Sequence, residues 1–281
     1  MRLNFRILNV FTVAGEALTG NPLCVFEDGR GLDSDTMQAL ALQFNLSETT
    51  FILPADQATA AVRIFTPTLE LPFAGHPTLG TAHVVRDLMR TGSAITLSMS
   101  AGCVPVSFEG ALWTLRAAAP KWHACEASRV SALVAALGLA PAELAADPLW
   151  VSTGMEQLMV PLRTTQAVAA ATAGAGLAEF ANHSGKVGVY LFSPLEDAEM
   201  QVRFFFGKAG GAVIEDPATG SACANLGGFA LATGASLPLR RVLWQGRQVG
   251  RPSRLELTVD PAREILVGGE VIEIGRGVVT L

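Results

Sequence analysis

The sequence has few of the features that mark nucleic-acid-binding and membrane proteins. It contains one tyrosine, its longest basic run is Arg240-Arg241, and its formal charge is −5. These properties argue against nucleic acid and against an anionic membrane as partners. Charges, glycine or proline interrupt every apolar run before it reaches membrane-spanning length. The N-terminus alternates like a strand and lacks a signal-peptide core, so we expect a cytoplasmic protein.

Cysteine is also scarce. Cys24, Cys103, Cys125 and Cys223 occur singly, with no Cys-x-x-Cys pair. His123 lies near Cys125, but no second pair of ligands accompanies it in the sequence. We therefore expect no structural zinc or other metal and no disulfide framework, and we predict buried free thiols.

The chain is rich in hydrophobic residues. Its 281 residues are 50% hydrophobic, with a mean hydropathy of +0.38, and much of the excess is alanine and valine. A chain of this length can form one large domain or two of ordinary size.

One stretch organises the interpretation of the chain. Residues 215–222 read EDPATGSA, and an apolar run from Cys223 to Leu231 follows. Proline ends a strand and Thr-Gly-Ser favours the opening of a helix, so the pattern predicts strand end, turn and helix N-terminus. Such a terminus can hold an anion, because its N–H groups are unpaired and the helix dipole is positive there. Asp216 would lie beside the anion, where an acid or base is useful.

A second stretch has the same form. Residues 73–82 read FAGHPTLGTA, and aligning Gly75-His76 with Gly220-Ser221 brings Gly80 close to Gly227. The strand-like segments VRIF (62–65) and VRFF (202–205) precede the two copies. This similarity suggests an internal duplication, with two half-sites that face one another.

The remaining pattern predicts many strands and few helices. Expected helices include 37–44, a helix ending near Met89, 129–138, 165–172 and 222–234, and the sequence closes with expected strands at 254–260, 264–267 and 270–280. We predict an α+β fold in which a β-sheet wraps around a central helix, twice, as two pseudo-symmetric domains. The first half is expected at 1–120 and the second at 121–269, and whether the C-terminal strand 270–281 completes the first half stays open.

Several motifs together resemble the phenazine-biosynthesis isomerase family, called PhzF-like, which is related in fold to diaminopimelate epimerase and proline racemase. They occur in family order and cover almost the whole chain: GNPL (20–23), NLSET (45–49), RIFTP (63–67), AGHPTLG (74–80), EDPATGSA (215–222), QG (245–246) and GRPS (250–253).

The resemblance implies a homodimeric isomerase that uses no cofactor and no metal and has its site in the cleft between the two domains. The family glutamate that matches Glu48 moves a proton between two substrate carbons. The residues matching His76, Asp216 and Ser221 hold and polarise the substrate. The half-sites predicted above add the helix starts at Gly75 and Gly220, whose amides would bind a carboxylate of a small substrate.

The residues themselves leave simpler interpretations open. Glu48 enters a β-rich segment beside apolar neighbours that would raise its pKa, which suits a proton shuttle, but a solvated carboxylate at a strand start fits as well. His76 could be a core histidine, and Ser221 is most simply an N-cap that can also bind substrate. Arg63 and Arg203 are expected to brace the two halves.

Two other functions compete with the isomerase. One is an amino-acid epimerase or racemase. The epimerases that the predicted fold resembles use a cysteine in each half, but here the first turn carries His76 and the second Asp216-Pro217, with Cys223 expected inside the helix. The other alternative is a catalytically silent protein that binds a small anion. The second copy of the RIFTP motif is weaker, since Phe206-Gly207-Lys208 replaces the proline-containing end, which puts the pocket near 206–212 in doubt.

Overall fold

A computed structural model describes residues 1–207 and 211–281, so Lys208 of the weaker motif copy lies outside the described residues. The chain divides into two compact units, one made of Met1–Arg116 with Gly268–Leu281 and the other of Ala117–Val267. Among the helices of the described residues, none is long and apolar enough to cross a membrane.

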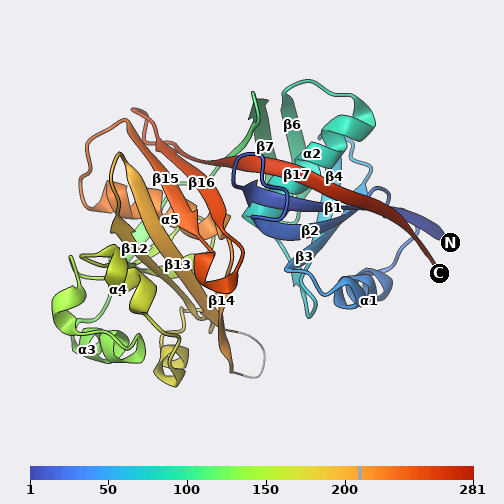
Figure 1. Ribbon diagram of the computed structural model, residues 1–281. Helices are drawn as coiled ribbons and strands as arrows, with labels where there is room; N and C mark the ends of the chain where they lie inside the picture. The colour runs from blue at the N-terminus through green and yellow to red at the C-terminus, as the bar shows by residue number, and fades with distance from the viewer. Residues whose placement is uncertain (208–210) are drawn as a thin grey trace. The chain divides into compact units, whose positions relative to one another are not determined.

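Unit 1, Met1–Arg116 with Gly268–Leu281, is a mixed sheet with one helix inside it and one outside it (Figure 1). Its elements are β1 (Arg2–Thr12), β2 (Asn21–Phe26), α1 (Ser34–Phe44), β3 (Glu48–Leu53), β4 (Ala60–Phe65), β5 (Glu70–Leu71), α2 (Gly75–Met89), β6 (Ala94–Met99), β7 (Gly102–Glu109), β8 (Leu112–Arg116) and most of β17 (Ile265–Thr280). The strands pair in the closed order β17–β1–β2–β3–β4–β6–β7–β8 and back to β17.

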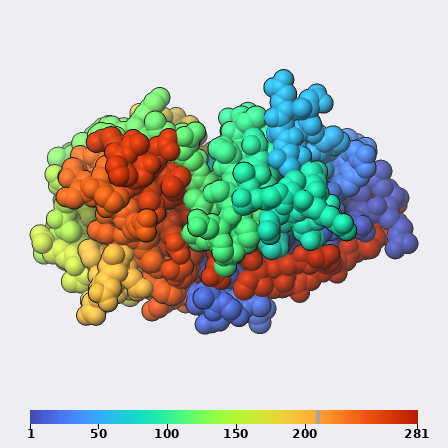
Figure 2. Space-filling view, turned by 90° about the horizontal axis from the view of Figure 1, so that it is seen from above, coloured from blue at the N-terminus to red at the C-terminus, as the bar shows by residue number. Residues whose placement is uncertain are grey.

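The C-terminal strand closes this ring. β17 runs antiparallel to β1 from Arg2 opposite Thr280 to Thr12 opposite Glu270, and in Figure 2 the red C-terminal strand lies against the blue N-terminal residues. The sequence predicted two closing strands at 264–267 and 270–280, and this was wrong, because β17 is continuous. The strand passes through Gly268 and Gly269 without a break, and the second glycine is needed there, because a Cβ on Gly269 would lie 2.3 Å from the Phe11 ring.

Unit 2, Ala117–Val267, contains β9 (Lys121–Ala124), α3 (Ala127–Ala136), η1 (Pro141–Glu143), β10 (Leu149–Ser152), β11 (Glu156–Pro161), α4 (Thr165–Ala170), η2 (Ala175–Glu179), β12 (Gly188–Pro194), β13 (Glu199–Gly207), β14 (Val213–Asp216), α5 (Gly220–Ala232), β15 (Leu239–Gln245), η3 (Arg247–Val249) and β16 (Ser253–Val259). Its ladder runs β9–β10–β11–β12–β13–β15–β16. β9 and β15 are strands that the sequence pattern did not predict.

The two units repeat one order of pairings. In unit 1, β2–β3 is parallel, β3–β4 antiparallel, β4–β6 parallel and β6–β7 antiparallel. In unit 2, β11–β12, β12–β13, β13–β15 and β15–β16 follow the same sequence of directions. The second parallel crossover carries the inner helix in each unit, α2 or α5, and α1 and α4 lie in the first crossover.

The inner helices are buried on almost every side, which explains their small, apolar composition. α2 contacts strands that include β1, β2, β3 and β8, and α5 contacts β9, β10, β11 and β16. A Cβ on Gly80 would lie 2.5 Å from Leu23, and one on Gly227 would lie 2.8 Å from Ile265. These two glycines therefore let each inner helix approach its sheet closely.

The outer helices cover the opposite face of each sheet. α1 begins after Asp33, whose carboxylate accepts the Thr36 N–H at 2.8 Å, and it ends at Asn45 in the left-handed conformation. Its buried residues pack on a phenylalanine cluster that includes the stacked pair Phe26–Phe51, with ring centroids 4.8 Å apart. Apolar residues near α3 and α4 form the corresponding cluster in unit 2.

Candidate active site

The first candidate site lies where α2 begins. Gly75 and His76 are its first two residues and both are buried. Ala74 occupies the N-cap position and offers no side-chain hydrogen bond to the first turn. The helix start therefore has backbone N–H groups that no capping side chain satisfies.

Glu48 lies against this helix start. It is the first residue of β3, and its carboxylate Oε2 lies 3.2 Å from Nε2 of His76, with both atoms buried. The two predicted residues, 28 positions apart in sequence, are thus brought into contact within unit 1. Glu48 is 15% exposed at its side chain, so the interpretation as a solvated strand-end carboxylate does not describe it.

The ring of His76 is held in its neutral form. Burial lowers the pKa of His76 to about 3, against a smaller opposing effect from a hydrogen bond to the Pro22 backbone. Proline has no N–H, so the carbonyl of Pro22 accepts this bond, and the donor is Nδ1 because Nε2 faces Glu48. A neutral ring that donates from Nδ1 presents a lone pair at Nε2, and a proton on the Glu48 carboxyl group would join the two groups.

The second candidate site lies where α5 begins. Thr219 is the N-cap residue, but its hydroxyl donates to the carboxylate of Asp216 instead of capping the helix. The buried side chain of Gln245 accepts from the Thr219 N–H at 3.3 Å and donates to the Asp216 carbonyl at 2.9 Å. Asp216 ends β14 and is partly exposed, and the Thr219 hydroxyl holds its carboxylate beside the first turn of α5.

Ser221 was expected to be the N-cap of this helix, and that prediction was wrong. α5 starts at Gly220, so Ser221 is its second residue and occupies the position that His76 has in α2. Its hydroxyl accepts a hydrogen bond from Gln157 at 3.0 Å, and Gln157 accepts one from Asn225 at 2.8 Å. Gln157 and Asn225 are buried and were not recognised in the sequence, because lone amides carry no motif.

Each unit contains an arginine–glutamate pair whose arginine also contacts the outer helix, α1 or α4. Arg63 pairs with Glu70 at 2.6 Å, and Arg203 pairs with Glu215 at 2.6 Å. Both arginines also lie over a phenylalanine two residues ahead, at 5.0 Å and 4.7 Å. The partners that the structure records for each arginine lie in its own unit, and the expectation that they brace the two halves stays a prediction.

The thiols differ from catalytic cysteines. Cys24 and Cys223 are fully buried, and burial raises the pKa of each thiol far above its ordinary value, which opposes thiolate formation. Cys223 lies inside α5, as expected. Cys125 is buried too, but Cys103 is exposed on β7, which corrects the prediction that the thiols are buried.

Three other side chains form a group able to hold a metal ion. His123, Glu156 and His183 offer one ligand atom each, and these atoms all lie within 4.8 Å of one another. The sequence had paired His123 only with nearby Cys125. Glu156 and His183 were missed because strand pairing and a loop bring them in from distant positions.

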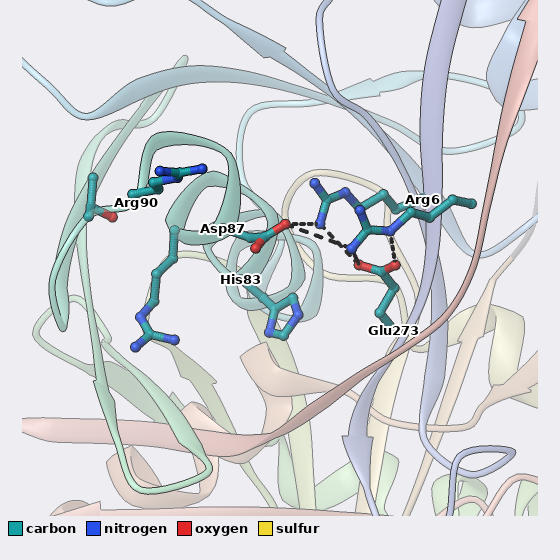
Figure 3. Close-up of a pocket in the computed structure, with 8 residues that line it drawn as sticks. Arg6, His83, Asp87, Arg90 and Glu273 are labelled. Atoms are coloured by element: carbon teal, nitrogen blue, oxygen red, sulfur yellow. Dashed lines mark hydrogen bonds and ion pairs between the residues drawn. The ribbon is translucent and has the colours of Figure 1, made fainter.

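A cavity of about 360 Å³ lies at the opposite end of α2 from His76, and Figure 3 shows its lining. Arg6 is buried there and binds three carboxylates, Glu27 at 2.6 Å, Asp87 at 2.6 Å and Glu273 at 3.1 Å. These contacts join β1 to α2 and β17 and outweigh the cost of burying the guanidinium, since its pKa is raised overall. The side chains at this end thus secure the inner helix to the closing strand.

Comparison with known proteins identifies the family. The model of the phenazine biosynthesis-like protein family matches residues 8–277. The chain belongs to this family. Its fold, a mixed sheet with few helices, is also that of a predicted epimerase from Pseudomonas aeruginosa, with a TM-score of 0.84, 30% identity and coverage of 99% of both chains.

Similar proteins with curated names are isomerases. An uncharacterized isomerase of Pasteurella multocida is 38% identical over 275 residues, which cover 97% of this chain and 92% of that protein. The trans-2,3-dihydro-3-hydroxyanthranilate isomerase of Pseudomonas aeruginosa is 33% identical over 276 residues, covering 95% and 94%. The chain is accordingly an isomerase of the PhzF type.

Proposed function

We propose that this isomerase moves a proton between two carbons of a small substrate that bears a carboxylate, without a cofactor. The substrate is trans-2,3-dihydro-3-hydroxyanthranilate or a related compound. The observation that carries the proposal is the buried contact between Glu48 and His76 at the uncapped start of α2. The names of the similar isomerases support the substrate class.

Glu48 is proposed as the group that carries the proton. A carboxyl group that takes a proton from carbon and returns it elsewhere must be stable both with and without that proton. Neutral His76 serves this need, since its Nε2 lone pair accepts a hydrogen bond from the protonated carboxyl group. Because the pKa of His76 is low, its ring stays neutral and does not retain the proton.

The two helix starts are proposed to hold the substrate. Backbone N–H groups at Gly75 and Gly220 are suited to bind its carboxylate and the negative charge that develops when the proton leaves. Asp216 and Ser221 would fix its other polar groups, because each already has a hydrogen-bonded partner that orients it. In this proposal the two units are pseudo-symmetric domains, and one substrate contacts the α2 start of one and the α5 start of the other.

Proton NMR in D₂O tests this proposal. Wild type and Glu48→Gln would each be incubated with dihydro-hydroxyanthranilate, a panel of amino acids and cyclic enamine-type acids. We expect isomerised product carrying solvent deuterium from the first compound with wild type, and none with the variant. Deuterium entering an amino-acid α-carbon would instead indicate an epimerase, and product formation that survives Glu48→Gln would contradict the assigned proton carrier.

Thiol alkylation separates the same alternatives independently. The proposed mechanism uses no cysteine, and both Cys24 and Cys223 are buried. We expect activity to survive N-ethylmaleimide, with Cys103→Ser as the control for modification of the exposed thiol. Loss of activity in that variant on alkylation would favour two-thiol racemase chemistry.

A further inference from the structure

A second cluster of reactive side chains lies on the outside of unit 2. Nε2 of His123 is 3.1 Å from Oε1 of Glu156, and Nδ1 of His183 is 2.9 Å from Oε2 of the same carboxylate. The two imidazole rings have centroids 5.5 Å apart. One carboxylate thus has a separate imidazole at each of its oxygens.

The fold positions each member by a different contact. His123 lies on β9 opposite Trp150 of β10, and its ring stacks on that indole with centroids 6.2 Å apart. Glu156 opens β11 opposite Ser152. His123 and Glu156 therefore belong to one antiparallel sheet, and their backbones are fixed by its ladder.

His183 comes from a loop that is anchored to Glu156. The side-chain amide of Asn182 donates to the Glu156 carbonyl at 2.9 Å. Its oxygen accepts from the backbone N–H groups of Ser184 and Lys186 at 2.9 Å and 3.0 Å. This loop therefore brings His183 back to the carboxylate although the two residues are 27 positions apart.

The group is open to solvent on the side of its two histidines. His123 and His183 are exposed at 48% and 81% of their side chains, so an ion can reach the group from solvent.

We propose that His123, Glu156 and His183 bind a divalent transition-metal ion of the zinc class. Two ligand atoms about 2.0–2.1 Å from a tetrahedral Zn²⁺ lie about 3.3 Å apart, and the two nitrogen–oxygen distances, 3.1 Å and 2.9 Å, are close to this spacing. Only the two imidazole nitrogens, which lie within 4.8 Å, would need to approach. The exposed side chain of His183 can make this movement by rotation.

The ligand types select the ion. Two imidazoles and one carboxylate suit Zn²⁺, Ni²⁺, Co²⁺ or Cu²⁺, whereas Mg²⁺ and Ca²⁺ prefer oxygen ligands throughout. Water would complete the coordination of the ion. Because the site is exposed to solvent, the bound ion could exchange. Because the ion would join the 182–186 loop to the sheet in the folded state, its binding should stabilise unit 2 by mass action.

Titration of untagged, chelator-treated protein with ZnCl₂ tests the site. Isothermal calorimetry should show one saturable ion per chain, and Co²⁺ should give a visible absorption band. His123→Ala, His183→Ala and Glu156→Gln should each weaken binding at least about tenfold, or ~1.4 kcal/mol. His83→Gln and Glu196→Gln, at a histidine and an exposed carboxylate elsewhere in the chain, should bind as wild type does.

Thermal unfolding gives a second readout. Added ZnCl₂ should raise the Tm of wild type and leave the Tm of His183→Ala unchanged, while the two proteins should have similar Tm values in chelator. Undetectable binding to wild type, or equal binding to wild type and all three ligand variants, would overturn the proposal. Equal circular dichroism spectra without metal would show that a loss of binding is not a loss of fold.

Discussion

The starts of α2 and α5 occupy the same place in two repeats of one strand order, yet their side chains differ. At α2 a buried histidine and a glutamate meet directly, at 3.2 Å. At α5 a serine takes the position of that histidine, and the nearby aspartate comes from the end of β14; their recorded partners are an amide and a hydroxyl. One start brings two ionisable groups into contact, and at the other the polar side chains are held by hydrogen bonds.

The arginine–glutamate pairs of the two units differ as well. The pair Arg203–Glu215 is exposed at 8% and 7% of its side chains, whereas Arg63–Glu70 is exposed at 27% and 34%. Arg203 also donates to the carbonyls of Val168, Ala169 and Ala171. The arginine pair of unit 2 is thus the more buried of the two, and its arginine makes more hydrogen bonds to the backbone.

The largest expected effect concerns the proposed proton carrier. Glu48→Gln keeps the size of the side chain but cannot take up a proton, so kcat should fall about 100- to 10,000-fold. Steady-state assays of the isomerisation, compared with the exposed control Glu16→Gln, measure this. If Glu48→Gln kept a near-normal kcat, the proposed functional difference between the two helix starts would be contradicted.

The arginine pairs should differ in their contribution to stability. Arg203→Met leaves Glu215 buried without its cation and should cost roughly 3–5 kcal/mol of unfolding free energy. Arg63→Met breaks a partly exposed pair and should cost about 0–1 kcal/mol. Urea unfolding of both variants tests the contrast, and equal losses would contradict it.

The buried histidine should make stability depend on pH. Its folded-state pKa is lowered from 6.5 to about 3, so the unfolded chain binds more protons within that range. Stability should therefore be lost as pH falls below 6.5, with a slope that approaches ~1.4 kcal/mol per pH unit from this residue.

His76→Gln should reduce this slope. Urea unfolding at a series of pH values in this range measures the slopes. If His76→Gln retained the wild-type slope, another group would have to account for it.

The smallest expected effect is at the other helix start. Ser221→Ala removes the acceptor of the Gln157 hydrogen bond and a proposed substrate contact, so KM should rise up to about tenfold with kcat little changed. Thr233→Ala, at the C-terminal end of α5, is the matched control. If kcat of Ser221→Ala fell as far as that of Glu48→Gln, the two helix starts would have the same role, contrary to this prediction.

Local sequence patterns predicted both inner helices and the similarity of their starts, because the turn residues and small apolar residues that define them are contiguous. They did not predict that Thr219 bonds to Asp216 instead of capping α5, or that Gln157 reaches Ser221, since both depend on contacts made by folding. The continuous β17 was missed because glycine usually interrupts a strand, while here Gly269 makes room for Phe11.

The most direct test of the account measures binding and proton exchange separately in Glu48→Gln and Asp216→Asn. Calorimetry gives the affinity for dihydro-hydroxyanthranilate, and NMR in D₂O gives the rate at which its carbon-bound proton exchanges. The account predicts that Glu48→Gln binds the substrate but does not exchange the proton, and that Asp216→Asn mainly loses affinity. Exchange that survives in Glu48→Gln and disappears in Asp216→Asn, at unchanged affinity, would contradict the account.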